Sequence, residues 1–155
     1  MTLPLKNTVL QVHPLFPGLL LFGFFTGRSS ILFSVLALLL HECGHLFVMR
    51  LFGIMPHQIT LTPFGGVMEL PVTDATTPLQ DFLCALAGPL FSFLGCLFCN
   101  SMLCHTAQPW LLSFFKGNLL LLLINLLPVW PLDGGRMLKA LLSFLLPEKT
   151  LQKAL

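Results

Sequence analysis

Charged residues are scarce in this sequence. Only 9% of its 155 residues are charged, against about a quarter in a typical soluble domain. The chain contains no tyrosine but fifteen phenylalanines, 55% of its residues are hydrophobic, and its mean hydropathy is +0.89. Such a chain has too few polar groups to cover a surface in water, so the composition excludes an ordinary soluble domain. It predicts an integral membrane protein whose main contact is the lipid bilayer.

Runs of basic residues are also missing. The formal net charge is +2, and lysine or arginine neither cluster nor alternate with aromatic residues, which excludes nucleic acid as an expected partner. The first residues contain one lysine, several prolines and no small-residue cleavage site. We interpret them as the entry to a first membrane span and not as a signal peptide.

Long apolar blocks predict an all-α polytopic membrane protein with about four transmembrane helices. The blocks are residues 14–26, which residues 3–12 could extend, and residues 29–52, 79–103 and 110–127. A further apolar stretch, residues 132–146, has basic residues near its start and is expected to lie partly in the membrane or along it. No repeat or second domain is recognisable, so we interpret residues 1–155 as one membrane core domain.

The segment between the second and third blocks, residues 57–78, is rich in β-branched residues, glycine and proline. This pattern predicts a short β-hairpin or extended loop at the membrane edge. We expect strands around Ile59 and Leu61 and around residues 67–72, joined by a turn at Gly65 and Gly66.

The basic residues also predict an orientation in the membrane. If the N-terminus is cytoplasmic and four blocks alternate, six of the eight lysine and arginine residues fall inside, as the positive-inside rule favours. These are Lys6, Arg50, Arg136, Lys139, Lys149 and Lys153. We therefore expect a multi-pass protein with a cytoplasmic N-terminus.

The second block contains the motif LLLHECGHLF. His41 and His45 are four residues apart, so they share one face of a helix and can bind the same metal ion. Glu42 is rotated about 100° from His41 around the helix axis, which suits a base at the flank of the metal better than a third equivalent ligand. Zinc accepts two imidazoles and a carboxylate, and in catalytic sites it keeps one position open for water. Glu42 would take a proton from this water as a peptide carbonyl is attacked.

A histidine in an apolar helix is commonly a hydrogen-bonded packing residue, which is the alternative to a metal ligand. Here three ionisable groups lie within five residues. Each charged group at the centre of a membrane helix costs about 3 kcal/mol on insertion scales. A shared metal ion removes most of that cost, so the pattern favours a metal site.

A two-histidine site needs another ligand, and Asp133 is the carboxylate in the most unusual context. It lies in NLLPVWPLDGGR, where two prolines and two glycines interrupt an apolar block. Broken helices at membrane depth are tolerated where they line a site. We therefore expect Asp133 to be the third ligand.

Residues 41–45, HECGH, together with residues 125–135, NLLPVWPLDGG, resemble the paired signature of the site-2 protease family of intramembrane zinc metalloproteases, peptidase family M50. Residues 63–66, PFGG, and 87–89, AGP, are similar to the branch of the stage IV sporulation protein FB. That branch processes the precursor of a sporulation sigma factor in endospore-forming bacteria. The resemblance extends from about Val12 to Leu155.

The resemblance implies a role for each motif residue. His41, His45 and Asp133 would bind Zn²⁺, and Glu42 would activate water. Asn125 would hold or polarise the substrate carbonyl, with capping of the broken end of its own helix as the alternative.

The resemblance also implies that residues 64–66 bind substrate. Phe64, Gly65 and Gly66 would belong to a membrane-embedded β-loop that receives the substrate as an added strand, because a helix must unwind before its peptide bond can be cut. The alternative is a simple surface turn.

The implied activity is an intramembrane zinc metalloendopeptidase in a bacterial cell membrane that cleaves a membrane-associated protein near the cytoplasmic face. A sporulation sigma-factor precursor is the expected substrate, with inhibitory membrane proteins as further partners. Two other functions stay open: a divalent-metal carrier, and a catalytically silent core that only binds partners. Members of the sporulation branch continue into further spans and a CBS domain, whereas this sequence stops at Leu155. We expect a truncated or minimal core without that domain.

Overall fold

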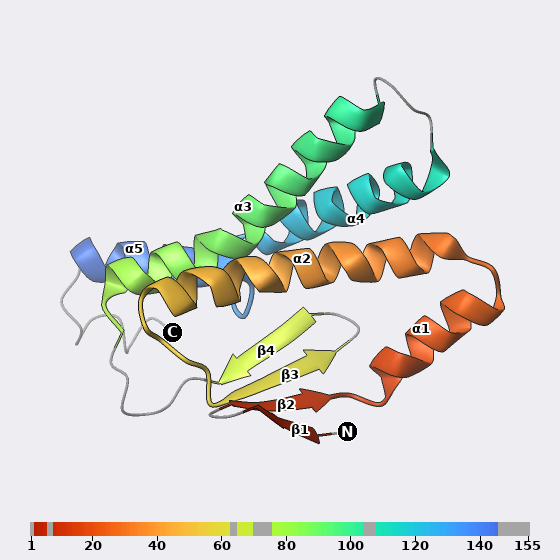
Figure 1. Ribbon diagram of the computed structural model, residues 1–155. Helices are drawn as coiled ribbons and strands as arrows, with labels where there is room; N and C mark the ends of the chain where they lie inside the picture. The colour runs from red at the N-terminus through yellow and green to blue at the C-terminus, as the bar shows by residue number, and fades with distance from the viewer. Residues whose placement is uncertain (1, 6–7, 63–64, 70–75, 104–107, 146–155) are drawn as a thin grey trace.

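The computed structural model describes residues 2–5, 8–62, 65–69, 76–103 and 108–145 (Figure 1). The elements in chain order are β1 (Thr2–Leu5), β2 (Thr8–Val12), α1 (Leu15–Phe25), α2 (Ser29–Leu51), β3 (Gln58–Thr62), β4 (Gly65–Glu69), α3 (Pro78–Leu103), α4 (Pro109–Asn125) and α5 (Asp133–Leu145). Helix α2 packs against α3 and α4, and α3 also packs against α4 and α5. The sheet lies along the opposite side of α2, towards its C-terminal half. Helix α2 is therefore enclosed between helices on one side and strands on the other.

The sheet has four strands in the order β1-β2-β3-β4. Strands β3 and β4 form the hairpin expected between α2 and α3. The fold is mostly helical, as expected, but the sheet contains more than the one expected hairpin. Residues 3–5 and 8–12, which could have extended the first span, belong to β1 and β2 instead. Residues Val9–Val12 of β2 pair in parallel with Gln58–Leu61 of β3. The backbone groups of β2 thus bond to a neighbouring strand, whereas in a helix they would bond within the segment. A short apolar segment can form either a strand or a helix, and its apolar character alone does not distinguish them.

The predicted turn at Gly65 and Gly66 is also wrong. Both glycines belong to β4, where they lie opposite Thr62 and Leu61 of β3. The two strands are joined at residues 63 and 64, so Phe64, expected to bind substrate, lies outside the described residues.

Two helices in the described part of the chain are long and apolar enough to cross a membrane: Ser30–Leu51 and Pro78–Leu103. Helices α1 and α4 are apolar but contain only 11 and 17 residues, and about 20 residues are needed to cross a hydrocarbon core. The expected four spans are therefore reduced to two that meet the length criterion, accompanied by two shorter apolar helices.

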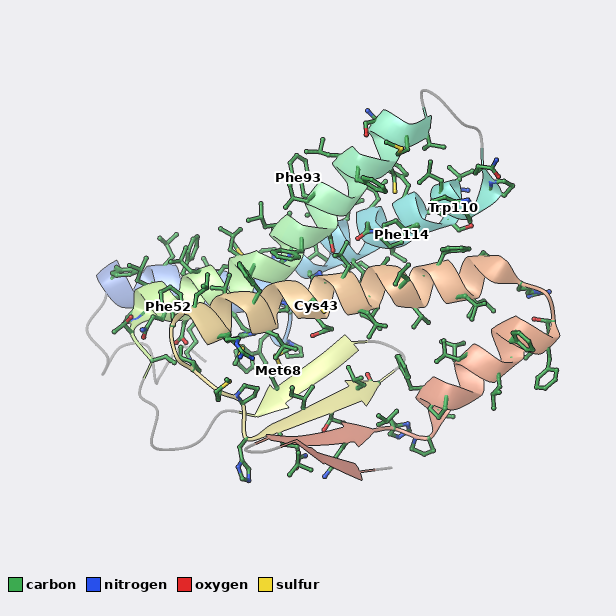
Figure 2. The ribbon with its side chains drawn as sticks, viewed as in Figure 1. Cys43, Phe52, Met68, Phe93, Trp110 and Phe114 are labelled. Carbon is green, nitrogen blue, oxygen red and sulfur yellow. The ribbon has the colours of Figure 1, made fainter. Side chains whose placement is uncertain are left out.

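Large apolar side chains cover the outside of the helices. Phe25 is 80% exposed, Leu51 68% and Phe93 45%, and Figure 2 shows Phe93 pointing away from the neighbouring helices. Exposed apolar surface of this extent is unfavourable in water and marks contact with lipid. Together with the two long apolar helices, it indicates a membrane protein.

Helix α5 occupies most of the last apolar stretch and is amphipathic, with Arg136 and Lys139 in its first two turns. Lys6, Lys149 and Lys153, which contributed to the expected orientation, lie outside the described residues. The cytoplasmic N-terminus stays a prediction.

Glycines allow α2 and α3 to approach closely at the level of the HECGH motif. A Cβ atom at Gly44 would lie 2.6 Å from the Ala87 carbonyl oxygen and 2.8 Å from Cγ of Phe91. Small residues commonly permit such close helix contacts in membranes. Gly44 therefore sets the distance between the helix that carries the histidines and its main neighbour.

Gly44→Ala tests this contact. Alanine favours a helix over glycine by about 1 kcal/mol, whereas overpacking a tight contact costs about 1–3 kcal/mol. We expect Gly44→Ala to lower the midpoint of thermal unfolding in detergent micelles, followed by circular dichroism. Gly18→Ala in α1, where a Cβ would meet no atom within 4 Å, is the matched control and should not lower it. Equal midpoints for the two variants would contradict the close contact.

Candidate metal centre

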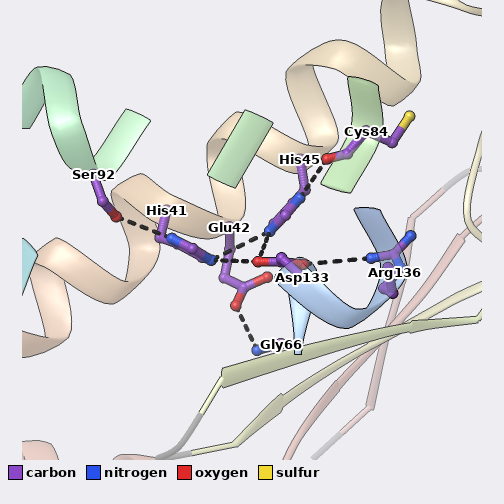
Figure 3. Close-up of polar contacts among 8 residues, drawn as sticks. All are labelled: His41, Glu42, His45, Gly66, Cys84, Ser92, Asp133 and Arg136. Carbon is purple, nitrogen blue, oxygen red and sulfur yellow. Dashed lines mark hydrogen bonds and ion pairs between the residues drawn. The ribbon is translucent and has the colours of Figure 1, made fainter. Parts of the chain in front are cut away.

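Three buried side chains from two helices converge at one point (Figure 3). His41 and His45 come from successive turns of α2, and Asp133 is the first residue of α5. The two Nε2 atoms are 3.3 Å apart, and each lies 3.2 Å from Oδ2 of Asp133. The structure thus places the aspartate where its carboxylate and both imidazoles can bind one metal ion.

The spacing and chemistry of these donors fit zinc. Ligands about 2.0 Å from a tetrahedral metal lie about 3.3 Å from one another, which matches the three separations of 3.2–3.3 Å. The three residues are 2–7% exposed. Three electron-pair donors that face one another away from solvent are stabilised by a cation between them. These residues could hold one metal ion and leave its fourth position for water or substrate.

Each histidine is oriented through its other ring nitrogen. Nδ1 of His45 lies 2.7 Å from the Cys84 carbonyl oxygen, which can only accept, so Nδ1 carries the proton and Nε2 presents its lone pair. Nδ1 of His41 lies 2.9 Å from Oγ of Ser92, a fully buried hydroxyl on α3. Such hydrogen bonds fix the tautomer and the ring orientation of metal-binding histidines. Helix α3 therefore positions both imidazoles of α2.

The two carboxylate oxygens of Asp133 face different partners. Oδ2 faces the imidazoles, while Oδ1 lies 3.6 Å from Nη1 of Arg136, one turn further along α5. The nearby guanidinium favours the ionised form of the Asp133 carboxyl group, which is the form that a metal ligand must have.

Two glycines allow the chain to return from α4 to the site. A Cβ atom at Gly134 would collide with the carbonyl oxygens of Leu126 and Leu127, and one at Gly135 would lie 2.6 Å from the Val129 carbonyl. The connection between α4 and α5 folds back onto the start of α5 at these positions. Tight packing beside the aspartate thus explains why glycine follows it at both positions.

The site opens into a cavity of about 480 Å³ between α2, the β3–β4 hairpin and the start of α5. Glu42, Asn125, Gly65 and Gly66 all line this cavity together with the three candidate ligands. Within the described part of the chain, the Asn125 side chain makes no hydrogen bond, so it is not seen capping its own helix. Its amide faces the cavity, where it could bind a ligand.

Sequence reasoning missed Ser92 and the contact made by Gly88. A Cβ atom at Gly88 would collide with the imidazole of His45. Gly88 and Ser92 are four residues apart, so they lie on the same face of α3. A serine one turn after an AGP step in an otherwise apolar helix was the available signal.

Comparisons with known proteins find relatives of this chain. The sequence model of peptidase family M50 matches residues 29–117 and 100–154. Stage IV sporulation protein FB from Bacillus subtilis is 33% identical over 143 residues, which are 89% of this chain and 49% of that protein. A zinc metalloprotease from Methanocaldococcus jannaschii is 34% identical over 131 residues, which are 75% of this chain and 37% of that protein. The chain thus spans half or less of the length of these relatives.

A solved structure shares the fold. The site-2 protease from Methanocaldococcus jannaschii matches with a TM-score of 0.74 at 24% identity, over 99% of this chain and 76% of that chain. The helices and strands described above are therefore arranged in the same fold as in that solved structure.

Ser92→Ala tests the orientation of His41. Loss of a hydrogen bond to a metal-binding histidine typically weakens metal affinity about 10–100-fold, and we expect a loss in this range for zinc, measured by chelator competition on detergent-purified protein. Ser101→Ala is the matched control, because Ser101 is an exposed serine of the same helix whose hydroxyl donates to the Phe98 carbonyl. An unchanged zinc affinity in Ser92→Ala would mean that Ser92 does not orient the ligand.

Proposed function

Because this chain belongs to peptidase family M50, we propose that it is an intramembrane zinc metalloendopeptidase. The observation that carries the proposal is the convergence of His41, His45 and Asp133 in a cavity that Glu42 also lines. The described chain covers half or less of its curated relatives, so the activity is proposed for the core that it contains. Zinc is the proposed cofactor.

Bound zinc would supply a Lewis acid that polarises the scissile carbonyl and lowers the pKa of a water molecule. Glu42 would accept a proton from that water as its oxygen adds to the carbonyl carbon. The same carboxyl group would then deliver the proton to the amide nitrogen as the C–N bond breaks. Glu42 is 7% exposed and lines the same cavity as the candidate ligands, which supports this role.

Asn125 is the proposed partner of the substrate carbonyl. It lies at the C-terminal end of α4 and lines the same cavity as Glu42. Its amide N–H₂ could donate to a carbonyl oxygen that gains negative charge in the reaction. This role is supported by the absence of another hydrogen-bond partner in the described part of the chain.

The β3–β4 hairpin is the proposed substrate platform. Strand β4 is at one edge of the sheet, and Gly65, Gly66 and Met68 line the cavity. An extended peptide added to this edge would gain backbone hydrogen bonds in place of those lost when its helix unwinds. Phe64 is proposed to contribute from the connection between the strands.

The proposed substrate is a membrane-associated protein, and the similarity to stage IV sporulation protein FB favours a sporulation sigma-factor precursor. Cleavage near the cytoplasmic face follows if the C-terminal end of α2 is cytoplasmic, because His45 is six residues before Leu51, about 9 Å along the helix. A multi-pass topology in a bacterial membrane with a cytoplasmic N-terminus, and control by inhibitory membrane proteins, belong to the same proposal.

Glu42→Gln is the decisive variant. Removing a general base costs about 10²–10⁴ in rate, so we expect cleavage of a co-expressed membrane-tethered sigma-factor precursor to fall at least 100-fold. The three candidate zinc ligands are unchanged, so the purified variant should retain one zinc ion per chain, measured by atomic emission. His41→Ala, which removes a ligand, is the contrasting control and should lose zinc.

The same variant separates the other functions. A divalent-metal carrier would keep much of its zinc transport in Glu42→Gln, and a silent core would show no zinc-dependent cleavage in the first place. Undiminished cleavage by Glu42→Gln would overturn the protease mechanism.

Asn125→Leu tests the substrate-carbonyl role. Removing a single donor to a developing oxyanion costs about 10²–10³ in kcat, and we expect a loss of this size on the same precursor. Zinc content and the midpoint of thermal unfolding should stay at wild-type values. A lowered midpoint with unchanged kcat would instead assign Asn125 to capping its helix.

A further inference from the structure

The carboxylate of Glu42 is held by a strand and not by its own helix. Its Oε1 accepts a hydrogen bond from the backbone N–H of Gly66 at 2.7 Å (Figure 3). The two residues come from α2 and β4, 24 positions apart in the chain. A buried carboxylate at membrane depth is stabilised by such a charge-assisted bond. The direction in which the carboxylate points is therefore decided by where β4 lies.

The donor lies on the free edge of the sheet. Gly66 is opposite Leu61 of β3, and its N–H points to Glu42, away from β3. Backbone directions alternate along a strand, so the N–H and C=O of Met68 are directed to the same side. The edge proposed to receive substrate and the edge that binds the base are one and the same.

Position 66 has no space for a side chain. A Cβ atom there would lie 2.6 Å from Oε2 and 2.7 Å from Cδ of Glu42. At Gly65 the nearest atom is Oε1 of Glu42, at an ordinary 3.7 Å, but the φ angle of +152° favours glycine. Glycine is thus favoured at the two positions for different reasons: the backbone conformation at position 65 and the volume of the Glu42 carboxylate at position 66.

We propose that Gly66 is the positioning residue for the catalytic base: its backbone N–H aims the Glu42 carboxylate into the metal site, and its missing side chain provides the space that the carboxylate fills. The inference rests on the proposed function, because it assigns Glu42 the role of base. One strand then aligns both reactants, since substrate paired beside Gly66 meets a carboxylate fixed to the same strand. The Gly66 N–H is engaged by Glu42, so substrate pairs through the Gly66 C=O and the Met68 backbone.

Gly66→Ala displaces the carboxylate without removing a ligand or a strand hydrogen bond. We expect kcat on the sigma-factor precursor to fall at least about 10-fold, within the total contribution of a general base, while KM changes less than two-fold. Zinc content and the unfolding midpoint should equal those of Gly18→Ala, a control at a position with open space. In a Glu42→Gln background the Gly66→Ala change should have no further effect, because groups that act as a unit are not additive.

A measurement without substrate tests the contact directly. In protein labelled with ¹⁵N-glycine, the Gly66 amide resonance, identified by its disappearance in Gly66→Ala, should lie downfield and should move upfield in Glu42→Ala. The amide should also exchange with solvent faster in Glu42→Ala, because its acceptor is gone.

Three results would overturn the proposal: a wild-type kcat in Gly66→Ala, loss of zinc or of folding stability together with activity, and a Gly66 resonance that Glu42→Ala leaves in place. Cleavage that survives Glu42→Gln would instead remove the proposed function itself. The two failures are therefore distinguishable.

Discussion

The structure depends on holding two imidazoles and a carboxylate 3.2–3.3 Å apart where water is scarce. Unpaired, these groups would oppose insertion into a bilayer; around a cation they stabilise one arrangement of the helices. Helix α2 supplies two donors by its own periodicity, and α5 supplies the third at its first residue. The other elements serve to keep these two helices in contact.

Helix α3 contributes through small and polar groups at positions where a larger apolar residue would be expected to pack. Gly88 leaves space for His45, while Ser92 and the Cys84 carbonyl fix the two ring orientations. The fold-back before α5 brings a carboxylate to the histidines and Arg136 to that carboxylate. Precision at the metal centre thus comes from residues that are themselves not ligands.

The sheet completes the other side of the site. It introduces a polar backbone edge beside Glu42, at a depth where an unpaired edge would be costly. The Gly66 N–H is satisfied by the carboxylate, and the neighbouring edge groups are suited to an incoming peptide strand. Glu42, the three candidate ligands and the free edge of β4 therefore meet in one cavity of about 480 Å³.

The sequence by itself determined the features that depend on composition and short spacing: the membrane environment, the pair His41 and His45 on one helix face, Glu42 beside them, and a break in the chain at Asp133. Only the tertiary structure decided that Asp133 meets His41, 92 residues away, that Ser92 bonds the same histidine, and that residues 2–5 and 8–12 are strands. The i,i+4 spacing is a property of one helix and can be counted along the chain. Partners on different elements are selected by packing, which no local pattern records, and for this reason Gly66 looked like a turn residue until its neighbour proved to be the Glu42 carboxylate.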